Sequence, residues 1–167
     1  RAGRMQQGNS QVKMLLNADT YEEAYGAFNW DVPEFFNMGV AVCDKHADNG
    51  PARTALTFEN ENGDVTRYSY QALKHLSNKL ANLFKAKGLE PGDRVGILMP
   101  QSVETGFAHI AAWKAGMISI PLFTLFGPDA LSFRLSDSGA KALITDTYNF
   151  GKIEAILDEL PDLKVVF

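Results

Sequence analysis

The chain has 167 residues, enough for one domain of ordinary size with a hydrophobic core. Apolar residues make up 46% of it and charged residues 22%, which excludes a disordered or fibrous protein. The net charge is −4 and the basic residues are scattered, which argues against a nucleic-acid partner because phosphate backbones require a clustered basic face.

The single cysteine, Cys43, excludes an internal disulfide and fits a reducing compartment. It lies in an apolar run, which favours a buried, unreactive thiol. No stretch approaches the ~18 to 20 apolar residues needed to span a bilayer, and residues 1–8 lack the apolar core of a signal peptide. We therefore expect a cytoplasmic protein without a membrane span. Residues 1–8 are either a flexible tail or a remnant of expression cloning.

Residues 1–32 are expected to form an N-terminal tail with an irregular or helical extension. Within this segment, Tyr21 and Tyr25 are aromatic residues at helical spacing. A stronger helix is predicted from Pro33 to about Ala47, because proline suits the first helical position. The side chains that recur along one face of this helix are Phe36, Val40 and Cys43.

A β-hairpin is predicted next. Two short strands, 53–58 and 65–69, flank a polar turn that contains Asn-Gly. The apolar spacing then becomes helical over residues 70–87, with leucines on one face and polar side chains on the other. Gly88 is expected to end this helix.

The rest of the chain alternates short apolar strands with helices. Such alternation is typical of βαβ units and predicts an α/β fold: a doubly wound, mainly parallel sheet with helices on both faces. The expected strands are 94–99, 117–121, 142–145 and 164–167, and the expected helices are 102–115, 128–138 and 148–160. Because the chain stops as a strand begins, we expect it to be part of a larger domain.

The common catalytic and phosphate-binding motifs are absent from this sequence. It has no Gly-x-Gly-x-x-Gly, no Gly-x-x-x-x-Gly-Lys-Ser/Thr, no Gly-x-Ser-x-Gly and no Cys or His pairs at metal-ligand spacing. The three histidines are isolated. We interpret His75 as solvated, His109 as a satisfied surface or interface residue, and His46 as a complement to a helix dipole.

Ligands of open parallel sheets usually bind beyond the carboxyl ends of the strands. That location corresponds to three segments of this chain, 100–102, 122–127 and 146–147. Gln101 and Ser102 open a helix whose N–H groups can meet an anion, although simple capping is the favoured interpretation.

Several segments, in the correct order, resemble the motifs of AMP-forming acyl-CoA synthetases in the adenylate-forming superfamily. They are Tyr68-Ser69-Tyr70-Gln71-Ala72-Leu73, Gly88–Val95, Pro100–Glu104, Trp113–Gly116 with Ile120–Leu122, and Arg134–Lys141. The resemblance covers roughly residues 33–167 and implies that this region is the first, incomplete part of the family's large N-terminal domain. Phe36-Asn37 and Cys43–His46 are closest to acetyl- and medium-chain acyl-CoA synthetases.

The resemblance implies a reaction in two steps. A carboxylate attacks the α-phosphate of ATP, with Mg²⁺ assisting, to give an acyl-adenylate and pyrophosphate. The thiolate of CoA then displaces AMP. The family's phosphate loop, ribose-binding Asp, magnesium motif and C-terminal catalytic Lys lie downstream of the matched motifs. No catalytic or metal-binding residue is therefore assigned here, and the chain alone is expected to be inactive.

One loop carries the candidate binding residues. Residues 123–130 resemble a loop that lies beside the CoA nucleotide in acetyl-CoA synthetases. The arginines that some of these enzymes place further downstream, near the CoA 3′-phosphate, have no clear match here, and Lys152 is the basic residue nearest to their position. The CoA-proximal candidates are Phe123, Thr124, Leu125, Gly127 and Lys152. The family shows two glycines where this chain has Thr124 and Leu125, which favours a medium-chain or related carboxylate over acetate. An ordinary βα loop is the competing interpretation.

Two other functions stay open. The parent protein could be an adenylation enzyme that serves a carrier protein, or the chain could be a stand-alone α/β binding or interaction module. If the chain is a fragment, exposed apolar faces are expected to make it self-associate.

Overall fold

A computed structural model describes residues 18–30 and 32–167 of the chain. The chain divides into two units, residues 1–36 and residues 37–167, and each is described by itself. The interpretation of residues 1–8 as a tail or cloning remnant lies outside the described residues.

The first unit contains one short helix, α1 (Tyr21–Ala27), among its described residues. Thr20 caps this helix, because its Oγ1 accepts a hydrogen bond from the backbone N–H of Glu23 at 3.2 Å. The rings of Tyr21 and Tyr25 stack with their centroids 5.9 Å apart. The helical spacing of these aromatic residues in the sequence is thereby confirmed.

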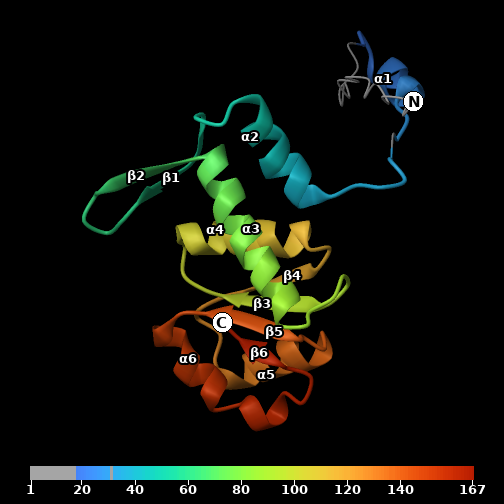
Figure 1. Cartoon of the computed structure of the whole chain (residues 1–167). Helices are drawn as coiled ribbons and strands as arrows, with labels where there is room; N and C mark the ends of the chain where they lie inside the picture. Colours follow the sequence, from blue (N-terminus) through green and yellow to red (C-terminus); the bar gives the residue numbers. More distant parts are fainter. Residues whose placement is uncertain (1–17, 31) are drawn as a thin grey trace, which may run out of the picture. The chain divides into compact units, whose positions relative to one another are not determined.

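The second unit contains the hairpin, the parallel sheet and the helices that cover it (Figure 1). Its strands are β1 (Thr54–Glu59), β2 (Val65–Ser69), β3 (Arg94–Leu98), β4 (Ile118–Leu122), β5 (Ala142–Thr145) and β6 (Val165–Val166). Its helices are α2 (Lys45–Asn49), α3 (Tyr70–Ala86), α4 (Val103–Lys114), α5 (Pro128–Asp137) and α6 (Thr147–Glu154), with a π-helical turn η1 (Val40–Asp44) and a 3₁₀ turn η2 (Leu157–Glu159).

The sheet is parallel and doubly wound. Its strand order is β4-β3-β5-β6, so that β3 pairs with both β4 and β5. Helices α3 and α4 pack against one face and α5 and α6 against the other (Figure 1). Strands β1 and β2 form a separate antiparallel hairpin. The predicted α/β architecture is therefore confirmed.

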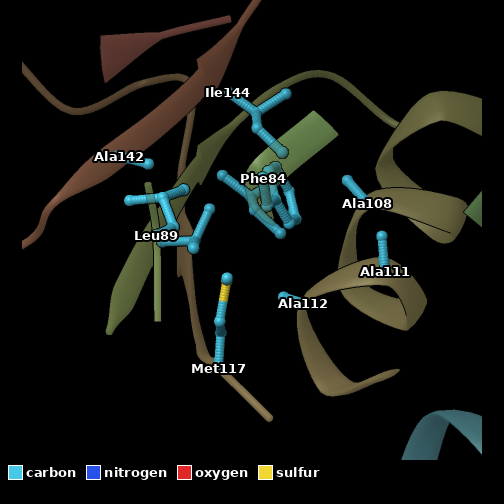
Figure 2. Close-up of a cluster of buried hydrophobic side chains, with 10 residues drawn as sticks. Phe84, Leu89, Ala108, Ala111, Ala112, Met117, Ala142 and Ile144 are labelled. Atoms are coloured by element: carbon cyan, nitrogen blue, oxygen red, sulfur yellow. The ribbon is translucent and has the colours of Figure 1, made fainter. Parts of the chain in front are cut away.

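Alternating side chains of the strands divide the core into two apolar clusters. Figure 2 shows Phe84 of α3 surrounded by small side chains of α4 and by residues of the sheet. The alanines of α4 let that helix approach the ring closely. The buried members of this first cluster are Phe84, Leu89, Val95, Ile97, Ala108, Ala111, Ala112, Met117, Ala142 and Ile144. Those of the second are Leu98, Leu122, Leu131, Leu135, Ala140, Leu143, Ile153, Ile156 and Leu160.

The helix boundaries follow from local chemistry. Ser69, Ser102 and Asp146 accept backbone N–H groups at the starts of α3, α4 and α6. Gly88 and Gly116 follow the ends of α3 and α4 with φ of 77° and 72°, a conformation that costs other residues free energy. These stops and starts agree with the sequence pattern.

Two predicted helix boundaries are wrong. The helix expected from Pro33 begins instead at Met38, because Asn37 supplies the cap: its Oδ1 accepts from the N–H of Val40 at 3.0 Å. The helix expected to reach Leu160 ends at Glu154. The chain then tightens into η2, which brings the side chains on either side of η2 into the second apolar cluster.

The helical segment 38–49, which contains η1 and α2, is held on α4 by a largely buried polar cluster. Lys114 Nζ lies 2.5 Å from Asp44 Oδ1, and it donates to Ser77 Oγ at 2.8 Å and to Asn78 Oδ1 at 2.9 Å. The side chain of Lys114 is 6% exposed and that of Asp44 is 17% exposed. We call Asp44, Ser77, Asn78 and Lys114 the Lys114 cluster. Because the Asp44 carboxylate pairs with the Lys114 ammonium, which also donates to two neutral side chains, the cluster fixes this segment without an unpaired ion.

Gly39 brings the same segment into close contact with α4. A Cβ at this position would lie 2.5 Å from Cγ of Lys114 and 2.8 Å from the backbone oxygen of Ile110. Real side chains do not approach this closely, so glycine is required by the spacing of the two helices.

Candidate functional site

Three loops meet at the carboxyl edge of the sheet because β3, β4 and β5 are parallel neighbours. Residues 99–102 follow β3, residues 123–127 follow β4, and Asp146 follows β5. The chain leaves β3 and β5 towards helices on opposite faces, which makes this edge the topological switch point of the fold. All five predicted CoA-proximal residues lie in, or contact, elements at this edge.

The loop after β4 places aromatic side chains at the surface. It is closed by one internal hydrogen bond, from the N–H of Phe126 to the carbonyl of Phe123 at 3.0 Å. The two phenylalanine rings meet edge to face with centroids 5.9 Å apart, and the guanidinium of Arg134 lies 4.2 Å from the Phe126 centroid. Phe123 and Leu125 point outward, with Leu125 79% exposed. Gly127 then starts α5 without a side-chain cap.

Lys152 reaches this loop from α6. Its Nζ donates to the carbonyl of Thr124 at 2.5 Å and to Asn149 Oδ1 at 3.2 Å. Asn149 in turn donates from Nδ2 to Asp146 Oδ1 at 2.8 Å, and its backbone N–H donates to the same oxygen at 2.7 Å. We call Asp146, Asn149, Lys152 and the carbonyl of Thr124 the Lys152 relay. It brings together two of the predicted candidates, Thr124 and Lys152.

The positive charge of Lys152 is only indirectly balanced. Among the described residues, no carboxylate lies within 4.0 Å of its Nζ, whereas Lys74, Lys114 and Lys141 each have one. Asp146 lies one residue further along the relay, beyond the neutral amide of Asn149. The site therefore carries a partly exposed ammonium group that attracts an anion at close range.

A hollow of about 260 Å³ lies between the ends of β3 and β4, on the side of α4. Its walls are mainly apolar, with three neutral polar side chains. The lining residues are Ile97, Met99, Gln101, Thr105, His109, Pro121, Leu122, Phe123 and Phe126. Such a hollow suits an uncharged, largely apolar group of a few atoms.

His109 is held in this wall by a hydroxyl group. One ring nitrogen, Nδ1, lies 3.0 Å from Ser119 Oγ, which also accepts the indole N–H of Trp113 at 3.0 Å. Burial lowers the pKa of His109, so that the neutral imidazole is the favoured form. The interpretation of His109 as a hydrogen-bonded residue agrees with this geometry. Among residues 18–30 and 32–167, no group of His, Cys, Asp and Glu could hold a metal ion.

A second hollow at the same edge, of about 430 Å³, lies beside the ends of β5 and β6. Thr145, Asp146 and Thr147 contribute its polar wall, and the remaining lining residues are Phe150, Leu157, Val166 and Phe167. A larger hollow of about 580 Å³ lies at the opposite, amino edge of the sheet, away from every predicted candidate.

The simple capping interpretation of Ser102 is correct. Its Oγ accepts the N–H of Thr105 at 3.2 Å, and Thr105 Oγ1 donates to the carbonyl of Pro100 at 2.6 Å. Sequence reasoning missed Asn149, which is 3% exposed and lies at the centre of the relay. The signal was present, because an Asn three residues after a capping Asp meets that cap in the first turn of a helix.

No helix in the described part of the chain is long and apolar enough to cross a membrane.

The comparison with protein families gives a match to the AMP-binding enzyme family over residues 43–167. An acetyl-coenzyme A synthetase of Campylobacter jejuni is 37% identical over 118 residues, which are 71% of this chain and 18% of that protein. The human mitochondrial acyl-coenzyme A synthetase ACSM3 is 30% identical over 153 residues, 88% of this chain and 26% of that protein.

A solved structure has the same fold. The acyl-CoA synthetase of Brucella canis superposes with a TM-score of 0.77 at 28% identity, over 89% of this chain and 28% of that one. The matched part of this chain thus spans 18% of the Campylobacter jejuni protein and 28% of the Brucella canis one, less than a third of the length of either relative. Since the family match covers most of the sequence, the chain belongs to the AMP-binding enzyme family.

Proposed function

We propose that this chain is the part of an acyl-CoA synthetase that carries the first βαβ units of its large domain. The whole protein would activate a carboxylate with ATP to an acyl-adenylate and transfer the acyl group to CoA, releasing pyrophosphate and AMP. The observation that carries this proposal is the family match over residues 43–167. The acetyl- and acyl-coenzyme A synthetases among the relatives support it.

The proposed cofactors are ATP, Mg²⁺ and CoA, acting in the whole protein. The family's catalytic motifs are not in these 167 residues, so we expect the chain alone to catalyse neither half-reaction. Its contribution to catalysis is positional: it supplies the scaffold on which a substrate-binding edge is built.

We propose that CoA approaches the carboxyl edge at the loop after β4. Phe123 and Leu125 expose apolar surface there, and Lys152 supplies a positive charge that no described carboxylate pairs directly. This combination suits a nucleotide, which has a flat base and anionic phosphates. The proposed CoA-proximal residues are Phe123, Thr124, Leu125, Gly127 and Lys152.

A medium-chain or related carboxylate is the proposed substrate. The resemblance places Thr124 and Leu125 where the acetyl-CoA synthetase pattern has two glycines, and side chains limit close backbone approach. An enzyme that serves a carrier protein is the alternative within the same chemistry. It would accept the phosphopantetheine of a protein and not free CoA.

A segment exchange tests the proposal. Residues 37–167 would replace the corresponding segment of the Brucella canis acyl-CoA synthetase, whose structure defines the boundaries. We expect ATP–pyrophosphate exchange and thioester formation with the hybrid, and neither with the 167-residue chain. A folded hybrid that exchanges pyrophosphate without forming a CoA thioester would contradict the CoA assignment. Turnover of a phosphopantetheinyl protein would then support the carrier-protein alternative.

Two further properties belong to the proposal. Side chains such as Ile118, Phe133 and Tyr148 are exposed, and we expect the isolated chain to self-associate through such apolar surface. Sedimentation velocity over a range of concentrations measures this, and a monomer throughout would contradict it. We also propose a cytoplasmic location, because the single cysteine, Cys43, is a free thiol and fits a reducing compartment.

A further inference from the structure

The bond from Lys152 to Thr124 joins segments that follow different strands. Thr124 lies just after β4, and Lys152 lies in α6, which follows β5. Because β3 stands between these two strands in the sheet, the bond crosses the end of the central strand. Among the described residues, it is the one hydrogen bond between the loop 123–127 and α6.

The direction of each bond in the relay is fixed by chemistry. A carboxylate accepts hydrogen bonds and an ammonium group donates them. The buried amide of Asn149 must therefore turn Nδ2 towards Asp146 and Oδ1 towards Lys152. Asp146 is anchored as the cap of α6, where the helix dipole favours a negative charge. Through Asn149, the rigid first turn of α6 thus fixes the position of Lys152 Nζ.

Apart from Phe126, which packs against the second apolar cluster and lies under the Arg134 guanidinium, the loop has few other restraints. Its internal hydrogen bond joins Phe126 to Phe123, its outer side chains are exposed, and no side chain caps α5 where the loop ends. A segment with so few buried contacts opens locally at low free-energy cost. A charge-assisted hydrogen bond to its central carbonyl is therefore a large part of what holds it.

We infer that Lys152 is a positioning residue: with Asp146 and Asn149, it holds the carbonyl of Thr124 and thereby sets the conformation of the loop 123–127. Two of the three N–H groups of its ammonium are already used by protein acceptors. The restraint of the loop concerns this chain alone. Its effect on CoA binding rests on the proposed function.

Hydrogen exchange of the 167-residue chain tests the restraint directly. We expect Lys152→Met to accelerate exchange of the Phe126 amide about tenfold, because local opening loses a charge-assisted bond. Lys152→Arg keeps the charge and donors and should restore most of the protection. Lys141→Met removes one lysine at the other end of β5 and should leave this amide unchanged.

Two results would overturn the inference. One is unchanged exchange at Phe126 in a folded Lys152→Met variant. The other is equal acceleration of the amides of β3 and β5, which would show a general loss of stability in place of loop opening. Thermal melting and far-ultraviolet circular dichroism of each variant establish that it is folded.

The hybrid synthetase separates positioning from direct phosphate binding. If Lys152 positions the loop, Lys152→Met raises KM for CoA and for 3′-dephospho-CoA by the same factor, about tenfold. If KM rises for CoA alone, Lys152 binds the 3′-phosphate and the positioning role is overturned. A hybrid without activity would count against the proposed function, while the exchange experiment still decides the role of Lys152.

Discussion

Two lysines at opposite edges of the sheet make contrasting connections. Lys114 ends α4 at the amino edge, is 6% exposed, and meets a carboxylate and two neutral acceptors. Lys152 lies in α6 at the carboxyl edge and meets a backbone carbonyl and an amide, with no described carboxylate within 4.0 Å. The charge of Lys114 is neutralised by Asp44, and its contacts stabilise the packing of the helices. The second keeps net charge at an accessible edge, where a ligand or a loop can use it.

The strongest test of this contrast removes the anion of the Lys114 cluster. Asp44→Leu leaves the Lys114 charge buried without a partner, and we expect the free energy of unfolding to fall by about 3–5 kcal/mol. Urea denaturation measures this change. The double variant Asp44→Leu with Lys114→Met should recover most of the loss, because it removes both charges. A loss below about 1 kcal/mol in the single variant would show that the pair is solvated like a surface ion pair.

Alanine substitutions at two glycines compare the packing of the two regions: Gly39 contacts α4 near Lys114, and Gly151 lies in α6 beside Lys152. Gly39→Ala would place a Cβ 2.5 Å from Cγ of Lys114 and 2.8 Å from a backbone oxygen, and we expect it to cost about 1–3 kcal/mol. Gly151 of α6 has no atom within 4 Å of such a Cβ. Gly151→Ala should therefore stabilise the chain by about 0.5–1 kcal/mol. Urea denaturation measures both changes in the free energy of unfolding. Equal changes would show that residue 39 does not pack closely against α4.

Lys152→Met should have a smaller effect on overall stability. We expect a loss of about 1 kcal/mol, because one partly exposed hydrogen bond disappears and its acceptors can turn to water. Lys114→Met serves as the comparison, since it strands Asp44 and should cost several times more. If both lysines cost the same in urea denaturation, the division between scaffold and accessible edge is wrong.

The smallest expected effect is a pH dependence that originates at His109. Burial lowers its pKa in the folded chain, so the unfolded chain binds more protons in acid. Stability is therefore unaffected above the unfolded pKa of about 6.5, falls as the pH drops below it, and stops falling below the folded pKa. His109→Gln should reduce the difference in unfolding free energy between about pH 7.5 and about pH 5.5. An unchanged difference would show that other groups dominate.

Most of the fold could be predicted from the sequence because its signals are local. Ser102 and Gly116 bracket α4 within a few residues, and the apolar strands are visible as short runs. The predicted start of the helical segment 38–49 is wrong because Pro33 is a favourable first residue. The actual cap, Asn37, also depends on a partner that is distant in the sequence. Its Nδ2 donates to the carbonyl of Lys114, 77 residues away.

The candidate site was less predictable for the same reason. Thr124 was selected by the resemblance and Lys152 only as the basic residue nearest to the family's unmatched arginines, and only the fold shows that the two meet across 28 residues of sequence. The sequence indicates that Asn149 can meet the capping Asp146, but not that it links Asp146 to Lys152, because a polar residue in an amphipathic helix is normally solvated. Its burial arises from the tertiary packing of α6 against the sheet. The acceptor that a lysine binds depends on which residues the fold brings near it, and residue spacing along the sequence does not reveal them.

The central position of β3 also dictates the order of events in folding. The hairpin β1–β2 joins neighbouring segments and can close in about 1–10 μs. No two strands of the main sheet can pair until a helical crossover brings them together, and β3 must wait for both β4 and β5. During synthesis, one edge of β3 is covered once β4 has emerged, while the other stays open until β5 follows. The relay from Lys152 to Thr124 can form only after that step, so a closed loop reports that β4, β3 and β5 have been joined, whether or not β6 has yet been added.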